Sequence, residues 1–150
     1  MIIYHGGYCE IKTPRIIKSR FKKDFGEGFY CTEIKEQAKR WCLKFDEPTI
    51  TSYEYKEDKK LSILKFETMT EEWLDFIVSC RKGTEHDYDV VIGAMANDQI
   101  YNFINSFVRN IISREAFWAL AKFKYPTHQI TFCTEKSLSC IKYINSERIK

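Results

Sequence analysis

The chain has few of the features that would divide it or assign it at once to a class. Its 150 residues contain only three prolines and six glycines, and no low-complexity segment, internal repeat or Pro/Gly-rich linker interrupts them. A chain of this length can bury a sizeable core as one unit. We therefore expect a single domain over residues 1–150.

Metal sites, disulfides and membrane segments are not indicated either. The six cysteines form no C-x-x-C pair and have no His-x-x-x-His partner, so we expect reduced, buried thiols rather than metal ligands. The longest apolar run, residues 90–96, is too short to cross a bilayer, and the N-terminus is too short and soon too polar for a signal peptide. These features predict a protein of the reducing cytoplasm, with no membrane partner.

The net charge indicates no particular class of ligand, but the aromatic content is informative. A net charge of only +3 makes no strong argument for nucleic-acid binding. The basic clusters at 18–23 and 56–60 are typical of a solvated face, although the first would also suit a phosphate-bearing ligand. The aromatic content of 15% is high, and such residues fill cores and also form flat binding walls.

Apolar periodicity and capping residues predict a mixture of strands and helices. We expect strands at 2–4, 29–32, 49–55, 61–66, 88–92 and 129–133. We expect helices after a Thr32 cap, between a Thr68-x-x-Glu71 capping box and Gly83, and over 100–111, 115–122 and 134–144. Strands and helices do not alternate strictly, which favours an α+β fold over a doubly wound sheet.

The common catalytic signatures are missing. The chain has no phosphate-binding Walker loop, no Gly-x-Ser-x-Gly and no zincin pattern, and the glycine pair Gly26 and Gly28 lacks the third glycine of a dinucleotide fingerprint. His86 and His128 are isolated, and we interpret both as surface or capping residues.

Three separate segments nevertheless form a pattern. Tyr4-His5-Gly6-Gly7 ends the first expected strand, and Gly26-Glu27-Gly28-Phe29-Tyr30 leads into the second, with Trp41 eleven residues after Tyr30. Gln129 begins a late strand. In this order and spacing, the segments resemble the diphtheria-toxin and poly(ADP-ribose) polymerase branch of the ADP-ribosyltransferases. In that branch a first-strand histidine precedes a glycine, a Gly-x-Gly-x-Tyr turn precedes a second aromatic, and a late strand begins with the catalytic glutamate.

The resemblance covers nearly the whole chain, and two runs point to a narrower group. Residues 24–32 and 122–129 are similar to a small bacterial family of this superfamily, some of whose members look like toxins encoded beside a small partner protein. The resemblance implies a single-domain ADP-ribosyltransferase-like α+β fold, with split mixed or antiparallel sheets and flanking helices, that uses NAD as a substrate.

The resemblance also assigns roles to residues of this chain. Tyr30 and Trp41 would sandwich the flat nicotinamide ring, and the backbone of Gly6, next to Gly7, would hold its carboxamide. His5 would donate a hydrogen bond to a ribose hydroxyl. The expected catalytic residues are therefore His5, Tyr30 and Gln129, and the expected NAD-binding residues are His5, Gly6, Gly7, Asp24, Tyr30 and Trp41.

Two positions depart from the family pattern. Gln129 stands where the family has glutamate, and an amide can hold a hydroxyl but carries no charge and cannot act as a base. Polymer elongation is therefore not expected, and Asp24, Glu27 or Glu135 would have to supply a negative charge, Glu135 being the weakest candidate because it is expected to begin the last helix. Gly7 stands where the polymerases usually have Ser or Thr. On sequence alone, Gln129→Glu is expected to preserve or raise NAD cleavage.

Three functions follow as alternatives. The first is mono-ADP-ribosyl transfer from NAD to a macromolecule, protein or nucleic acid, by an intracellular bacterial toxin that a small antitoxin protein holds in check. The second is an NAD glycohydrolase, in which water is the acceptor. The third is a module that binds NAD or ADP-ribose without turnover, which the uncharged Gln129 would suit.

Overall fold

The computed structural model describes residues 1–16, 23–95, 98–121 and 127–149. Of the basic cluster 18–23, only Lys23 is among them, and residues 122–126 of the run 122–129 also lie outside the described part. Pro126, expected to end a helix, is one of these.

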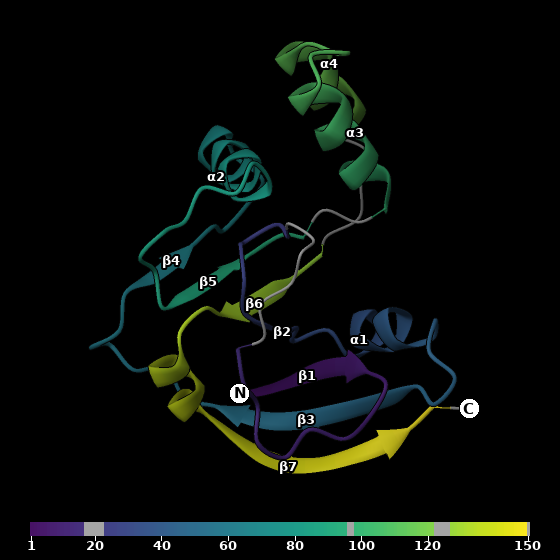
Figure 1. The fold of residues 1–150 in the computed structure, drawn as a ribbon, viewed down its shortest axis with the longest axis vertical. Helices are drawn as coiled ribbons and strands as arrows, with labels where there is room; N and C mark the ends of the chain where they lie inside the picture. Colours follow the sequence, from purple (N-terminus) through teal and green to yellow (C-terminus); the bar gives the residue numbers. More distant parts are fainter. Residues whose placement is uncertain (17–22, 96–97, 122–126, 150) are drawn as a thin grey trace.

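Seven strands in the described residues form two sheets, so the fold is α+β (Figure 1). The first sheet is antiparallel with the order β1-β3-β7, where β1 is Ile2–Gly7, β3 is Thr49–Tyr55 and β7 is Ile141–Arg148. The second has the order β2-β6-β5-β4, where β2 is Phe29–Cys31, β6 is Gln129–Phe132, β5 is Val90–Gly93 and β4 is Ile63–Lys65. It is mixed, because β4 and β5 are parallel and the other pairs are antiparallel.

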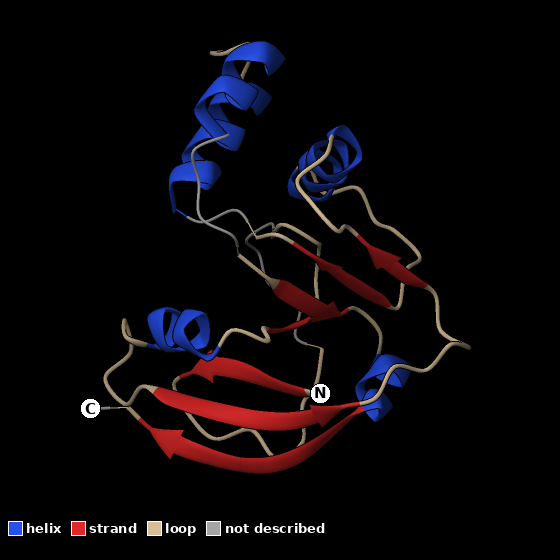
Figure 2. Ribbon diagram, turned by 180° about the vertical axis from the view of Figure 1, so that it is seen from behind, coloured by secondary structure: helices blue, strands red, loops and turns tan. Residues whose placement is uncertain are grey.

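Helices pack against both sheets, and Figure 2 shows the arrangement from the opposite side. The four α-helices among the described residues are α1 (Lys35–Cys42), α2 (Glu71–Arg81), α3 (Asp98–Val108) and α4 (Arg114–Ala121). α1 packs on the first sheet through Ala38, Cys42 and Ile50. α2, α3 and α4 share an apolar cluster with the second sheet that includes Trp73, Val91 and Phe117. No helix of the described residues is long and apolar enough to span a membrane.

The main core lies between the two sheets. Alternate residues of a strand point to opposite faces, so each sheet contributes one set of side chains to this layer. Ile3 and Tyr53 come from the first sheet and Phe29, Ile130 and Phe132 from the second, all of them buried. Burial of such side chains is the dominant favourable term in folding, which fixes how the two sheets face each other.

Most expected elements are confirmed, with differences at their ends. β3 has the expected bounds, and β2 and β6 are each one residue shorter than expected. β1 runs on to Gly7 instead of ending at Tyr4, because its pairing with β3 continues to Thr49. The expectation of buried cysteines is wrong for Cys9, which is exposed, although all six thiols are free. The described residues contain no cluster of groups suited to a metal ion.

Two expected helix caps are wrong. α2 is capped by Thr70, whose hydroxyl accepts from the Trp73 amide at 3.2 Å, and not by Thr68. Both threonines fit a capping pattern, but Thr70 directly precedes the first helical residue. The N-cap of α1 is Ile34 and not Thr32. The Thr32 hydroxyl accepts from the Ile34 amide at 3.1 Å, so Thr32 stabilises the turn that precedes the helix.

The largest correction concerns the C-terminal region. Residues 134–144 are not one helix: a short 3₁₀-helix, η1, covers Glu135–Cys140, and the chain then forms the strand β7. β7 pairs along its length with β3, about ninety positions earlier in the chain. That long-range pairing, which also buries Ile141, outweighs the local apolar spacing from which a helix was expected.

Candidate functional site

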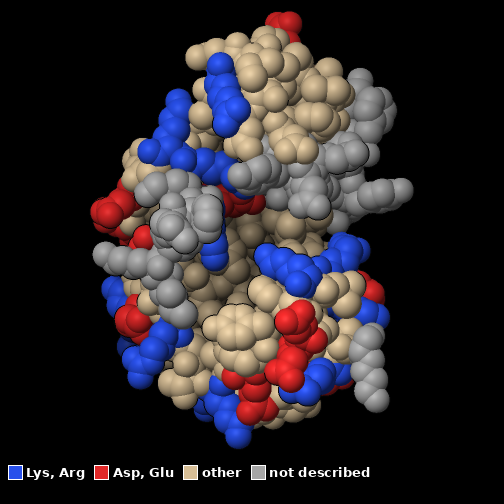
Figure 3. Space-filling view, turned by 45° about the vertical axis from the view of Figure 1, so that its right-hand side comes forward, with Lys and Arg blue, Asp and Glu red and all other residues tan. Residues whose placement is uncertain are grey.

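The two sheets join at one point and then separate. Tyr4 and Thr32 exchange two backbone hydrogen bonds, of 2.8 and 2.9 Å, which connect β1 to the end of β2. On one side of this bridge β1 continues along β3 while β2 pairs with β6 in the other sheet. We call the space between the diverging strands, from Gly6 on β1 to Tyr30 on β2, the wedge. Figure 3 shows a hollow between the upper and lower halves of the molecule, bordered by Lys and Arg side chains.

Gly6 presents its backbone to the wedge. In an antiparallel strand the N–H and C=O of one residue point to the same side, and this side alternates along the chain. Because Tyr4 directs both groups toward Thr32, Gly6 directs both groups to the same edge, where β2 has turned away. The edge therefore offers one donor and one acceptor on adjacent backbone atoms.

The other face of Gly6 is closed by α1. A Cβ atom at this position would lie 2.1 Å from the Ala38 carbonyl oxygen and 3.3 Å from Trp41 Cβ. No side chain fits in this space, so a glycine is needed for α1 to pack directly on β1. The same close approach places Trp41, which is half-buried, beside Gly6.

His5 connects the two strands where they part. Its ring stacks on Phe29, with centroids 4.3 Å apart, and its Nδ1 lies 2.7 Å from the Tyr30 carbonyl oxygen. A carbonyl only accepts, so Nδ1 carries the proton and Nε2 of the neutral ring is an acceptor. Burial lowers the pKa of His5 despite the hydrogen bond to Tyr30, and the Lys23 charge lowers it further, which favours this neutral form. A ligand hydroxyl at Nε2 would then donate to His5, whereas the sequence led us to expect His5 to be the donor.

Gly7 keeps this nitrogen open. A Cβ atom at Gly7 would lie 3.2 Å from His5 Nε2, on the same side of β1. The missing side chain thus leaves room for a ligand atom next to the imidazole.

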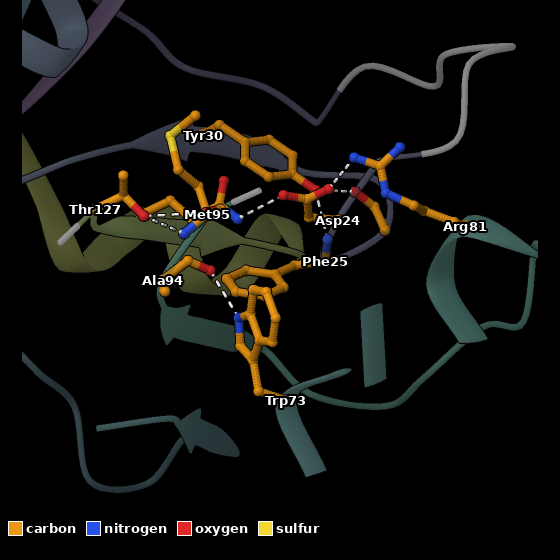
Figure 4. Close-up of polar contacts among 10 residues, drawn as sticks. Asp24, Phe25, Tyr30, Trp73, Arg81, Ala94, Met95 and Thr127 are labelled. Carbon is orange, nitrogen blue, oxygen red and sulfur yellow. Dashed lines mark hydrogen bonds and ion pairs between the residues drawn. The ribbon is translucent and has the colours of Figure 1, made fainter. Parts of the chain in front are cut away.

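Tyr30 is fixed through its hydroxyl. The hydroxyl donates to the Gly26 carbonyl and accepts from the Phe25 amide at 3.2 Å (Figure 4). Burial, together with the nearby Asp24 charge, raises the pKa of Tyr30 well above its ordinary value, so the phenol stays protonated. Lys23 Nζ lies over the ring, 5.0 Å from its centroid. Burial and the charge of Lys44 lower the pKa of Lys23, so these two lysines are close enough to repel each other.

Gln129 belongs to a buried polar cluster on the second sheet. It opens β6 with 4% of its surface exposed, and its Nε2 lies 3.4 Å from Asp24 Oδ2. The other oxygen of Asp24 forms an ion pair with Arg81 at the end of α2, as Figure 4 shows. Asp24 and Arg81 are themselves largely buried, with side-chain exposures of 8% and 10%.

The sequence-predicted residues therefore fall into two groups. His5, Gly6, Gly7 and Trp41 belong to β1 and α1, while Asp24, Tyr30 and Gln129 belong to the second sheet and the loop before it. The rings of Tyr30 and Trp41 make no contact with each other in the described part of the chain. Of the other candidate acids, Glu27 is exposed, and Glu135 accepts from the Ile16 amide at 3.2 Å.

Sequence reasoning missed two residues here, Arg81 and Lys23. Arg81 is 57 positions from Asp24 and stands in no motif, so nothing in the sequence signals the pair. Lys23 was visible only as one member of a basic cluster. His86 and His128 hold backbone groups, as expected of structural residues: His86 Nε2 lies 2.9 Å from the Phe25 carbonyl, and His128 Nδ1 accepts from the Glu33 amide at 3.2 Å.

Comparison with known proteins gives a family and nothing more specific. No curated protein and no solved structure matches the chain. A family model described as "Protein of unknown function (DUF3990)" matches residues 1–143, which include the whole wedge and both sheets up to the middle of β7. The chain therefore belongs to the DUF3990 family.

Proposed function

We propose that the wedge binds NAD and that the protein is a mono-ADP-ribosyltransferase with an ADP-ribosyltransferase-like fold. The observation that carries the proposal is the edge of Gly6, which offers one N–H and one C=O where β1 and β2 part. A carboxamide such as that of nicotinamide has one acceptor and one amino donor at matching spacing. Gly6 would therefore bind this group with two hydrogen bonds.

Two aromatic residues belong to the elements on either side of that edge. Tyr30 is part of β2, and Trp41 lies on α1 next to Gly6, so we expect a flat ring held by Gly6 to meet both. Stacking on aromatic faces suits nicotinamide. Lys23 covers the Tyr30 ring, and it would move aside toward the negatively charged diphosphate of NAD.

The proposed reaction breaks the bond between the ribose C1′ and the nicotinamide nitrogen. The electron pair of that bond leaves with nicotinamide, which becomes neutral, and the ribose becomes an oxocarbenium ion. An acceptor oxygen or nitrogen then bonds to C1′ and loses its proton to solvent. His5 Nε2 and Gln129 Oε1 would accept hydrogen bonds from ribose hydroxyls, which orients the sugar for this step.

The neutral Gln129 favours a single transfer over polymer elongation, because no glutamate stands at its position to act as a base. The acceptor would be a protein or nucleic acid, and a small antitoxin would be the natural partner if the protein acts as a toxin. The same residue also supports a second candidate, a module that binds NAD or ADP-ribose without turnover.

One assay separates these functions. The protein is incubated with NAD and cell lysate, and nicotinamide release and label on macromolecules are followed separately. Label on protein or nucleic acid supports the transferase, free ADP-ribose alone supports a glycohydrolase, and NAD binding without release supports the binding module. Absence of both binding and release would overturn the proposal.

Tyr30→Ala tests the ring site directly. Loss of a stacked platform should weaken NAD binding by roughly 1–3 kcal/mol, measured by calorimetry. Tyr143→Ala is the matched control, because Tyr143 lies on β7, two strands away from β1, and should leave the affinity unchanged. Equal affinities of wild type and Tyr30→Ala would rule out the sandwich.

A further inference from the structure

The amide of Gln129 has a defined orientation. A carboxylate only accepts hydrogen bonds, so the Gln129 group that faces Asp24 Oδ2, at 3.4 Å, is its amino group. The amide oxygen Oε1 consequently points away from Asp24. An amide oxygen is an acceptor that suits a ligand hydroxyl.

The orientation depends on a second contact. Arg81 pairs with the other oxygen of Asp24, so the carboxylate is held between α2 and β6. Arg81 is a cation paired with Asp24, so the pair is better suited to fixing a neighbouring group than to supplying negative charge to a ligand. The three side chains come from a loop, a helix and a strand that only the fold brings together.

We propose that Asp24 and Arg81 are positioning residues that hold the Gln129 amide in one orientation, so that its Oε1 takes the place of a glutamate oxygen at the nicotinamide ribose. This inference rests on the proposed function. The carboxylate polarises the amide through its N–H groups, which strengthens Oε1 as an acceptor. Gln129 then aligns the 2′-hydroxyl, while the glycosidic bond breaks as described above.

The arrangement has a consequence for the reverse substitution. In Q129E, the introduced carboxylate would face Asp24 at close range, and two like charges in a buried site disfavour each other. Q129E alone should therefore lower the rate of nicotinamide release. In the double variant D24N/Q129E the two functional groups exchange places: an amide at position 24 donates to a carboxylate at position 129.

The test compares kcat and KM for nicotinamide release, with melting temperatures, for wild type, D24N, Q129E and D24N/Q129E. We expect D24N to lower kcat roughly tenfold, since the lost contact involves a charged group. Q129E should lower kcat several-fold, and D24N/Q129E should return to within about threefold of wild type. D89N is the matched control, because Asp89 is equally buried and has a lysine partner but lies outside the wedge, so D89N should lose stability and keep kcat.

Each outcome decides the inference. A Q129E enzyme as fast as, or faster than, D24N/Q129E would overturn it, and this comparison stands even if D24N alone does not fold. Wild-type kcat in a folded D24N would overturn it as well, with NAD cleavage itself intact. If the wild type binds NAD without cleaving it, the same comparison is made in dissociation constants: a wild-type dissociation constant in folded D24N would overturn the inference, and a weakened one that D24N/Q129E restores would support it. A wild type that neither binds nor cleaves NAD removes the proposed function and the inference together.

Discussion

Asp24 and Asp89 are the two acidic residues that the structure buries among those it describes, and they are held differently. Asp89 accepts from the Ser62 backbone amide at 2.9 Å and from the Thr134 hydroxyl at 2.8 Å, with Lys136 at 3.6 Å. Asp24 is bound by the side chains of Arg81 and Gln129. Lys136 is 69% exposed, whereas Arg81 is 10% exposed, so only Asp24 has a buried cation.

The different partners of the two carboxylates suggest different roles in the structure. Asp89 fixes the chain before β4 and the start of η1, and its partners are those of a residue that holds loops together. Burial alone would raise the pKa of Asp89, but the Ser62 amide, the Thr134 hydroxyl and Lys136 lower it overall. Asp24 instead contacts two side chains, Gln129 and Arg81, and the proposed positioning role rests on these contacts.

The largest effect should come from removing the buried cation. Arg81→Met leaves the Asp24 charge buried without its guanidinium, which typically costs about 3–5 kcal/mol of folding free energy. Lys136→Met, the corresponding change at Asp89, should cost no more than about 1 kcal/mol, because Lys136 is largely in solvent. Urea unfolding of both variants measures the difference. Similar losses would mean that the two carboxylates are held in equivalent ways.

A smaller effect is expected from Asp89 itself. Asp89→Asn should destabilise the protein by about 1–3 kcal/mol at pH 7, since the Ser62 amide loses its charged acceptor. The lowered pKa means that the folded state binds its proton more weakly than the unfolded state, so this contribution is present above about pH 4, the ordinary carboxyl pKa, and is lost as pH falls through the lower folded-state pKa. Acid unfolding curves should thus converge for wild type and Asp89→Asn. A constant gap down to pH 2 would contradict this assignment.

The smallest expected effect on folding stability concerns His5. Burial favours the neutral form of this residue, whereas the two aspartates are buried in their charged form. Its lowered pKa means that unfolding takes up a proton, so folding stability should decline as pH falls below about 6.5, the ordinary pKa of histidine. His5→Gln should reduce this decline. Burial lowers the pKa of His128 too, so the comparison is best made between His128→Gln and the double variant His5→Gln/His128→Gln. Parallel stability curves from pH 7 to 5 would show that His5 does not titrate in this way.

The prediction of the fold was accurate wherever the local pattern had one interpretation. β3 alternates over seven residues and has the expected bounds, and Gln129 begins its strand as expected. The interpretation of residues 134–144 as a helix was wrong because β7 is stabilised by β3, a partner that no local window contains. The sequence could predict which strands and helices carry the candidate site residues. It could not predict the contacts of Asp24 with Gln129 and Arg81, because Arg81 belongs to no recognisable motif.

The sequence by itself determined the α+β character and the approximate positions of most strands and helices, because periodicity and glycines act over a few positions. Only the tertiary structure decided that β1 and β2 part after one bridge, which leaves the Gly6 edge open, and that His5 Nδ1 faces the Tyr30 carbonyl. It also changed the expectation for Gln129→Glu, because a carboxylate at that position would face Asp24. Such contacts join residues that are far apart in the chain, and their energies depend on burial and distance, which the order of residues alone does not specify.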